Sequence, residues 1–104
     1  MNYKLDLQKI ADELEFDLED VEMLIEVFLE SVTESLQSLN NAIMSNDYEA
    51  ILYSAHSIKG SAANLTLMHI SELARTIEYH ARAKDAIEYN KFYDELKKYI
   101  NDIK

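Results

Sequence analysis

Apolar residues recur every three or four positions along most of this chain, the spacing that places them on one face of an α-helix. The longest run covers about residues 20–45, and the next covers about 47–64. Two more runs cover about 66–84 and about 86–104, and a short one precedes them at 7–14. The pattern predicts an all-α fold with four main helices and a short N-terminal cap helix.

Polar residues mark the breaks between these runs. Asp47 can supply the N-cap of the helix over 47–64, because its side chain can accept a hydrogen bond from a free backbone N–H. We expect Asn64 to end that helix in the left-handed conformation, which asparagine tolerates, and Thr66 to cap the helix that follows. The result is a sharp reversal between two helices.

The last helix is predicted to start after a capping box formed by Asp85 and Glu88. All the connections are short, so consecutive helices have no other neighbours to pack against. We therefore expect an antiparallel up-down four-helix bundle. With 104 residues and a mass of 12.1 kDa, the chain should form one domain over residues 1–104.

Composition narrows the classes of function. Twenty acidic and ten basic residues give a net charge of −10, which repels a phosphate backbone, so we expect no nucleic-acid partner. No stretch approaches the roughly 18 apolar residues of a membrane span, and the N-terminus lacks the apolar region of a signal peptide. We expect a soluble, cytoplasmic protein. Since cysteine is absent, disulfides, thiolate metal sites and cysteine nucleophiles are excluded.

The strongest candidate for chemistry is His56, in the helix predicted over 47–64. If Ala55 faces the core, His56 lies about 100° further round the helix, on the flank of the bundle. Lys59, Gly60 and Ala63 follow at i+3, i+4 and i+7 and share that flank. An exposed imidazole should therefore lie beside one cation and a strip of small residues.

Packing alone does not explain these neighbours. Gly60 is the only glycine in the chain, and glycine inside a helix costs about 1 kcal/mol relative to alanine. We infer that something approaches the helix closely at this point. Lys59 disfavours a positive charge on His56, so the imidazole should stay neutral and nucleophilic near pH 7.

Other chemistry has little support. His69 and His80 lack a neighbouring Lys-Gly pair and are interpreted as solvated or edge-packing residues. His56 has no His, Asp or Glu at i+3 or i+4, so we predict no metal site. No base accompanies Ser57 or Ser61, and no glycine-rich loop could bind ATP. We predict no cofactor.

The segment Ala55–Gly60 resembles the phosphorylation motif of histidine phosphotransfer (HPt) domains, a family that includes the first domain of chemotaxis histidine kinases. The order and spacing of further segments are similar to the family pattern, over about residues 5–100. These segments are Asp20–Glu30, Leu39–Asp47, Ser61–Leu65 and Leu73–Glu78.

The resemblance implies a phosphoryl carrier rather than an enzyme. His56 would accept the phosphoryl group on Nε2 from the aspartyl phosphate of a response-regulator receiver domain and pass it to another receiver. Lys59 would steady the phosphoryl group, and Gly60, with Ser57 and Ala63 around it, would let the receiver approach. Magnesium would be bound by the receiver alone.

Glu78 falls at the family position that orients the imidazole by accepting a hydrogen bond from Nδ1. This role requires the third and fourth bundle helices to pack side by side. Two positions depart from the family pattern, because Thr66 and Ala63 stand where glycine is usual or frequent. We expect Asn64 to take over the helix-ending role.

Three hypotheses follow for the biological role. The first is a monomeric phosphorelay intermediate that binds receivers and obtains phosphate from a hybrid or chemotaxis-type histidine kinase. The second is a helical interaction module whose histidine is never phosphorylated. The third is an excised phosphoacceptor domain of a chemotaxis-type kinase, although Met1 and the cap helix favour a stand-alone protein.

Overall fold

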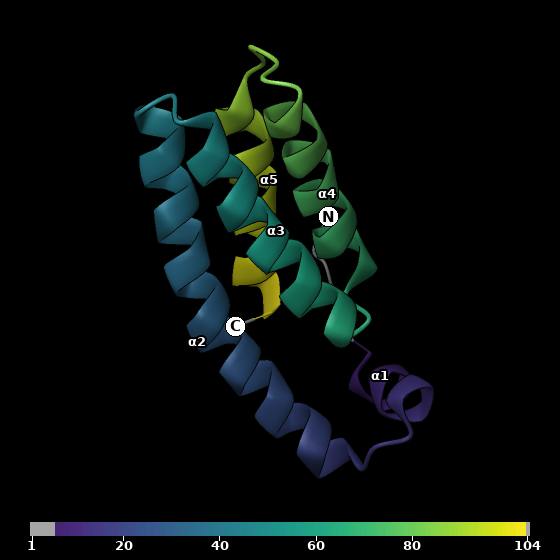
Figure 1. The fold of residues 1–104 in the computed structure, drawn as a ribbon. Coiled ribbons are helices and arrows are strands. Elements are labelled where there is room, and N and C mark those ends of the chain that lie inside the picture. Colours follow the sequence, from purple (N-terminus) through teal and green to yellow (C-terminus); the bar gives the residue numbers. More distant parts are fainter. Residues whose placement is uncertain (1–5, 104) are drawn as a thin grey trace.

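The computed structural model describes residues 6–103, which form five helices and no strand. The helices are α1 (Leu7–Leu14), α2 (Leu18–Met44), α3 (Tyr48–Asn64), α4 (Met68–Arg82) and α5 (Tyr89–Ile103). Helices α2 to α5 run alternately up and down, with α1 placed across one end of α2 (Figure 1). The predicted all-α four-helix bundle with a short N-terminal cap helix is confirmed.

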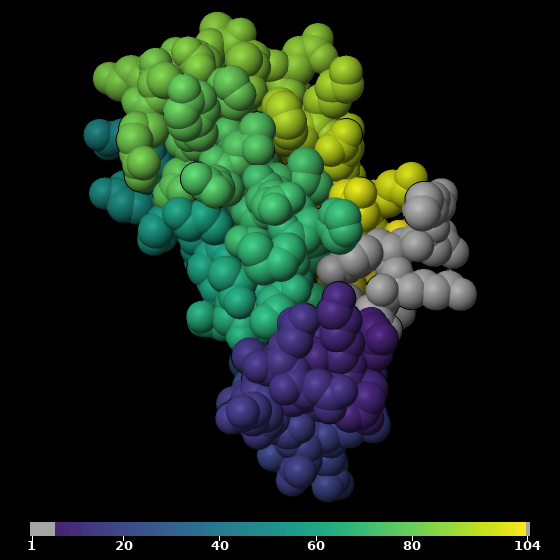
Figure 2. Space-filling view, turned by 90° about the vertical axis from the view of Figure 1, so that its right-hand side faces the viewer, coloured from purple at the N-terminus to yellow at the C-terminus, as the bar shows by residue number. Residues whose placement is uncertain are grey.

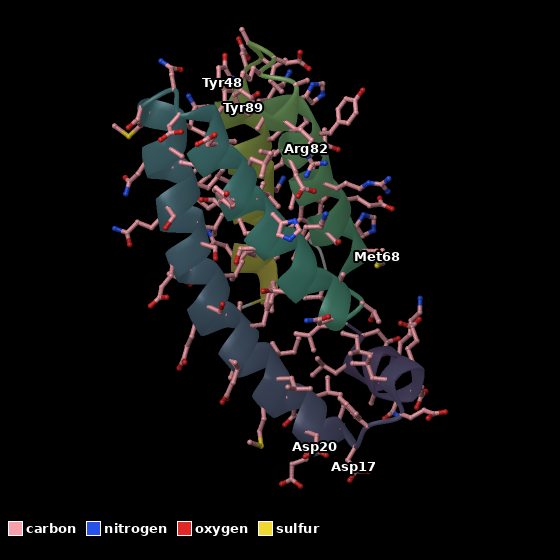
Figure 3. The ribbon with its side chains drawn as sticks, viewed as in Figure 1. Asp17, Asp20, Tyr48, Met68, Arg82 and Tyr89 are labelled. Carbon is pink, nitrogen blue, oxygen red and sulfur yellow. The ribbon has the colours of Figure 1, made fainter. Side chains whose placement is uncertain are left out.

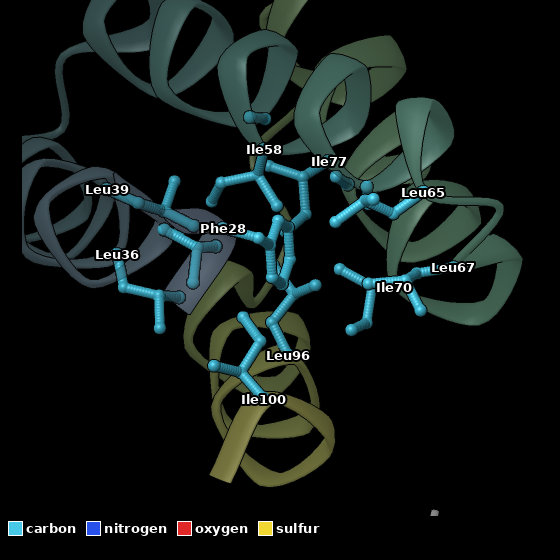
Figure 4. Packing of buried hydrophobic residues seen from close by; sticks show 14 of the residues in the cluster. Phe28, Leu36, Leu39, Ile58, Leu65, Leu67, Ile70, Ile77, Leu96 and Ile100 are labelled. Atoms are coloured by element: carbon cyan, nitrogen blue, oxygen red, sulfur yellow. The ribbon is translucent and has the colours of Figure 1, made fainter. Parts of the chain in front are cut away.

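The core lies between α2, α3, α4 and α5, each of which packs against two others. Every one of these helices contributes fully buried side chains, such as Leu39, Ile58, Ile77 and Leu96 (Figure 4). Burying a side chain of this size contributes about 1.5–3 kcal/mol. The contact between α3 and α4 is the most extensive, so the faces of these two helices are held firmly against each other.

Helix α2 is much longer than its neighbours, with 27 residues against 15 to 17 in α3, α4 and α5. Its N-terminal turns extend beyond the bundle (Figures 1 and 2), and α2 is the only one of the described helices that α1 contacts. Ile10 and Ala11 of α1 are buried there. Within residues 6–103, no helix is both long and apolar enough to cross a bilayer.

Each of the four connections between helices contains a residue other than glycine that has a positive φ. These residues are Glu15, Asn46, Thr66 and Lys84, with φ between 52° and 57°. After α3, the N–H of Thr66 donates to the carbonyl of Ala63, and the N–H of Leu67 donates to that of Ala62. This pair of bonds is the Schellman motif, which usually places glycine at the left-handed position.

The predicted role of Asn64 is wrong, because Asn64 still belongs to α3 and Thr66 takes the left-handed conformation. The Schellman motif brings the residue after the left-handed one back onto the helix, and here that residue is the buried Leu67. Thr66 does not cap α4, whose N-cap residue is Leu67. The predicted N-cap of α3 is confirmed, since the Asp47 side chain accepts from the N–H of Ala50 at 3.1 Å.

The capping box predicted at Asp85 and Glu88 is also wrong, because α5 begins only at Tyr89. The carboxylate of Asp85 lies 2.9 Å from Nδ1 of His80 instead, and its backbone carbonyl accepts from the Tyr89 hydroxyl at 2.6 Å. Figure 3 shows Tyr89 beside Tyr48 at this end of the bundle. The polar groups of Asp85 therefore contact residues at the end of the bundle and do not cap α5.

Candidate functional site

His56 lies near the middle of α3, on the flank of the bundle. Ala55 and Ile58 on either side of it are completely buried, whereas 62% of the His56 side chain is exposed. The core-facing residues thus fix the direction in which the imidazole points. The ring reaches solvent but remains close to α4.

Glu78 of α4 meets the imidazole. Its Oε2 lies 2.6 Å from Nδ1 of His56, although only 4% of the Glu78 side chain is exposed. An ionised carboxylate can only accept hydrogen bonds, so Nδ1 must carry the proton. In a neutral ring this tautomer leaves the lone pair on Nε2. The lone pair is therefore on Nε2, the ring nitrogen that is not hydrogen-bonded to Glu78.

The ionisation of Glu78 depends on its partners. Burial alone would raise the pKa of Glu78, but hydrogen bonds from Lys59 and His56, together with their charges, outweigh burial and leave the pKa below its ordinary value of 4.5. Lys59 Nζ donates to Oε1 at 2.6 Å. The two carboxylate oxygens are thus used by two different side chains of α3.

Cations surround this carboxylate more closely than the sequence suggested. The sequence predicts Lys59 beside the ring, but its ammonium binds Glu78, the carboxylate that contacts the ring. A second cation comes from α4, where Arg82 places one guanidinium nitrogen 3.6 Å from Glu78 Oε2. The Arg82 side chain is 68% exposed and lies on the flank of α4 that faces α3 (Figure 3).

A buried hydroxyl joins the two helices about two turns away from Glu78 along α4. Ser71 of α4 is 6% exposed, and its Oγ donates to the backbone carbonyl of Lys59 at 3.2 Å. Ser71 precedes Glu78 by two helical turns and lies on the same face of α4. This bond holds the register of α4 against α3, on which the meeting of Glu78 and His56 depends.

The surface next to the imidazole is bare. Apart from its chain neighbours and the nearby backbone of α3, a Cβ atom added to Gly60 would meet no atom within 4 Å, and Ala63 one turn further on is exposed. On the opposite side, the hydroxyl of Ser57 lies 3.5 Å from that of Ser35 in α2. His56 therefore projects from α3 between two flanking helices, with small side chains along the helix below it.

The other histidines lie elsewhere. His80 lies 2.9 Å from Asp85 and near Phe92, whereas His69 stacks on Tyr99 with ring centroids 5.9 Å apart. Across residues 6–103, no three His, Asp or Glu side chains are grouped so that they could hold a metal ion.

Sequence reasoning missed Arg82 and Ser71. Each had a signal, because Arg82 follows Glu78 at i+4 and Ser71 precedes it by seven residues, so all three share one face of α4. This spacing alone does not single out Arg82 or Ser71, because the sequence does not show which residues of α4 face α3.

Together, the fold and the site define a helical bundle that presents an imidazole to solvent and binds its Nδ1 through a buried carboxylate. The Hpt domain family matches residues 23–104, which is most of the chain. The chain belongs to the Hpt domain family.

Individual relatives agree with this assignment. The chain is 26% identical over 100 residues to the phosphorelay intermediate protein rdeA of Dictyostelium discoideum, and 26% identical over 77 residues to the phosphotransferase RcsD of Escherichia coli. These alignments cover 96% and 74% of the chain, but only 39% of rdeA and 9% of RcsD. The chain thus corresponds to a limited part of each relative.

A solved structure shows the same fold. Histidine-containing phosphotransfer protein B from Pseudomonas aeruginosa aligns with a TM-score of 0.78 and 21% identity, over 91% of this chain and 80% of that protein.

Proposed function

We propose that His56 carries the phosphoryl group, receiving it on Nε2 from the aspartyl phosphate of one receiver domain and passing it to another. The observation that supports this most directly is the bond between Glu78 and Nδ1 of His56, at 2.6 Å. It leaves the other ring nitrogen as the nucleophile on a side chain that is 62% exposed.

The transfer exchanges one bond for another. The Nε2 lone pair forms a bond to phosphorus, while the bond from phosphorus to the receiver's aspartate oxygen breaks and the electron pair leaves with that carboxylate. The proton on Nδ1 stays in place, and the positive charge that develops on the ring is stabilised by Glu78. The reverse sequence delivers the phosphoryl group to the next receiver.

The nearby cations have two tasks in this scheme. Lys59 keeps Glu78 ionised through their 2.6 Å contact, and we also assign it to steadying the phosphoryl group. Arg82 is the more exposed of the two cations and is bound less closely to Glu78, so it is free to turn toward phosphoryl oxygens. Gly60, Ala63 and Ser57 form the surface over which the receiver approaches.

In this proposal the chain is a carrier and not an enzyme. Magnesium and the catalytic carboxylates belong to the receiver, and a hybrid or chemotaxis-type histidine kinase supplies phosphate upstream. We place the protein in the cytoplasm as a monomer, in keeping with a net charge of −10 that opposes self-association.

The test is incubation with phosphorylated receiver domains. The wild type should acquire a phosphoryl group that is labile in acid and stable in base, whereas His56→Gln should acquire none. Phosphate retained by His56→Gln would refute the assignment. A wild type that binds receivers and never becomes phosphorylated would instead indicate an interaction module.

A further inference from the structure

A groove of about 340 Å³ opens between the first half of α2 and the last turns of α3. It is lined by Phe16, Leu24, Val27, Phe28, Ser31, Ser61, Asn64 and Leu65. Phe16 and Val27 are 49% and 62% exposed, which is high for large apolar side chains. Apolar surface gathered in a groove with polar residues at its edge is typical of an interaction site.

The groove continues from the site. His56, Gly60 and Asn64 follow one another at steps of four residues, so they form a single row along α3. At 1.5 Å per residue, Asn64 lies about 12 Å from His56 along the helix. A typical protein interface covers about 800 Å² on each partner, a patch roughly 16 Å in radius. A folded partner centred on His56 would therefore cover the groove as well.

The α2 side of this surface is strongly acidic. Helix α2 contains six of the 20 acidic residues of the chain and none of the ten basic ones. An exposed row at steps of four along α2 is formed by Glu22, Glu26, Glu30 and Glu34. Neighbouring like charges at this spacing destabilise a helix, so the row is no aid to folding.

This row winds round α2 as it advances, by about 40° at each step of four residues. Its last members, Glu30 and Glu34, stand three and seven residues after Val27 and so flank the groove side. The contact between Ser35 and Ser57 places this part of α2 beside the turn of α3 that carries His56. Its first members, Glu22 and Glu26, point away from the groove.

The α4 side carries two exposed guanidinium groups. Arg75 and Arg82 are exposed and seven residues apart, so they share one face of α4. Arg82 marks this face in Figure 3, in which Asp17 and Asp20 lie at the far end of α2. His56 is thus flanked by carboxylates on α2 and by guanidinium groups on α4.

We propose that this polarity sets the orientation of the docked receiver, an inference that rests on the proposed function. The receiver that fits presents lysine or arginine to α2, carboxylates to α4 and an apolar side chain to the groove. Charges arranged in this way accelerate association and reject a partner in the reversed orientation. A second copy of this chain fits less well, because it also carries a net charge of −10.

The experiment compares two matched double variants, Glu30→Lys with Glu34→Lys and Glu22→Lys with Glu26→Lys. Both change the net charge equally, on the same helix and at the same spacing. The partner is the receiver that transfers phosphate to the wild type fastest in a survey of the source organism's receivers. The second-order rate constant of transfer is measured at about 20 mM and about 0.5 M salt, the latter to screen long-range attraction.

At low salt, the variant altered at Glu30 and Glu34 should transfer at least about tenfold more slowly, and its matched control within about twofold of the wild type. The difference should narrow at high salt. Val27→Ser should raise KM about fivefold and leave the rate at saturation unchanged, because only docking is weakened.

Equal rates for the two double variants would overturn the docking inference while leaving the proposed function intact. Failure of the wild type to accept phosphate from any receiver would refute the proposed function itself. Sedimentation of the protein alone gives a further check. A wild-type dimer that is lost in the Glu30→Lys, Glu34→Lys variant would show that a second copy, and not a receiver, covers this face.

Discussion

Replacing Glu78 by glutamine tests the centre of the site, because the substitution keeps the shape of the side chain and removes its charge. The carboxylate now serves Nδ1 of His56 with one oxygen and Lys59 with the other, both at 2.6 Å. An amide has a single acceptor oxygen, and its NH₂ group can only donate. In Glu78→Gln, therefore, either one of the two bonds is lost, or Nδ1 accepts a hydrogen bond from the amide NH₂ and the ring takes the other tautomer.

The size of the effect follows from the burial of these groups. A hydrogen bond to a charged group contributes about 1.5–3 kcal/mol. Lys59 is 30% exposed and can recover part of this by turning to water, so we expect Glu78→Gln to lower the free energy of unfolding by about 1–2 kcal/mol. If the tautomer with its proton on Nδ1 comes to lie about 1.4 kcal/mol above the other one, only about a tenth of the rings carry the lone pair on Nε2, and transfer should slow about tenfold.

The tautomer of His56 and the rate of transfer are measured separately. Long-range ¹⁵N correlations of the imidazole should show a protonated Nδ1 and a bare Nε2 in the wild type above pH 8, and a mixture of tautomers in Glu78→Gln. Glu72→Gln, at an exposed position of the same helix, is the matched control and should change neither tautomer nor rate. A Glu78→Gln variant that keeps the wild-type tautomer and transfers within twofold of the wild-type rate would refute the orienting role.

Three further predictions follow from the structure. Because folding lowers the pKa of Glu78, its carboxylate stabilises the fold above about pH 4.5, and this stabilisation is lost as the pH falls through the lowered pKa. In urea unfolding, the difference in the free energy of unfolding between the wild type and Glu78→Gln should therefore shrink below pH 4.5. Thr66→Gly should raise the free energy of unfolding by about 0.5–1 kcal/mol, because glycine removes the strain of a positive φ. The greater entropy of glycine in the unfolded chain offsets part of this increase. A less stable variant would mean that contacts of the threonine side chain outweigh the strain. Gly60→Ala should raise the free energy of unfolding by about 1 kcal/mol, because the added methyl group meets no atom beyond its own stretch of helix within 4 Å. Gly60→Leu should melt normally and transfer phosphate more slowly. Normal transfer by Gly60→Leu would show that the bare surface has no part in docking.

The helices were predictable from the sequence because each buries one continuous apolar stripe, and the 3.6-residue period records that stripe directly. The reversals were less predictable. Asn64 has the better intrinsic tendency for the left-handed conformation, yet Thr66 adopts it, because burial of Leu67 decides which residue must turn. Asp85 likewise has the character of a cap, but a ring nitrogen of His80 lies beside its carboxylate.

The site was predictable where its residues share a helix. His56, Gly60 and Ala63 follow from spacing along α3 alone. The link to Glu78 crosses between helices, so its position came from the family resemblance and not from any periodicity. The ammonium of Lys59 could not be placed at all from the sequence, because a long side chain can reach either the imidazole or the carboxylate behind it.

Among the helices of residues 6–103, α1 contacts only α2, and this affects the order in which parts of the molecule unfold. A segment held by one neighbour can open at a lower free energy than a helix packed on two sides, and it does so without disturbing the remainder. Backbone amides of α1 should therefore exchange with solvent sooner than those of α3 and α4. Since Phe16, just after α1, lines the groove, a docked receiver would slow amide exchange in α1. Slower exchange there would reveal docking at a place distant from the histidine.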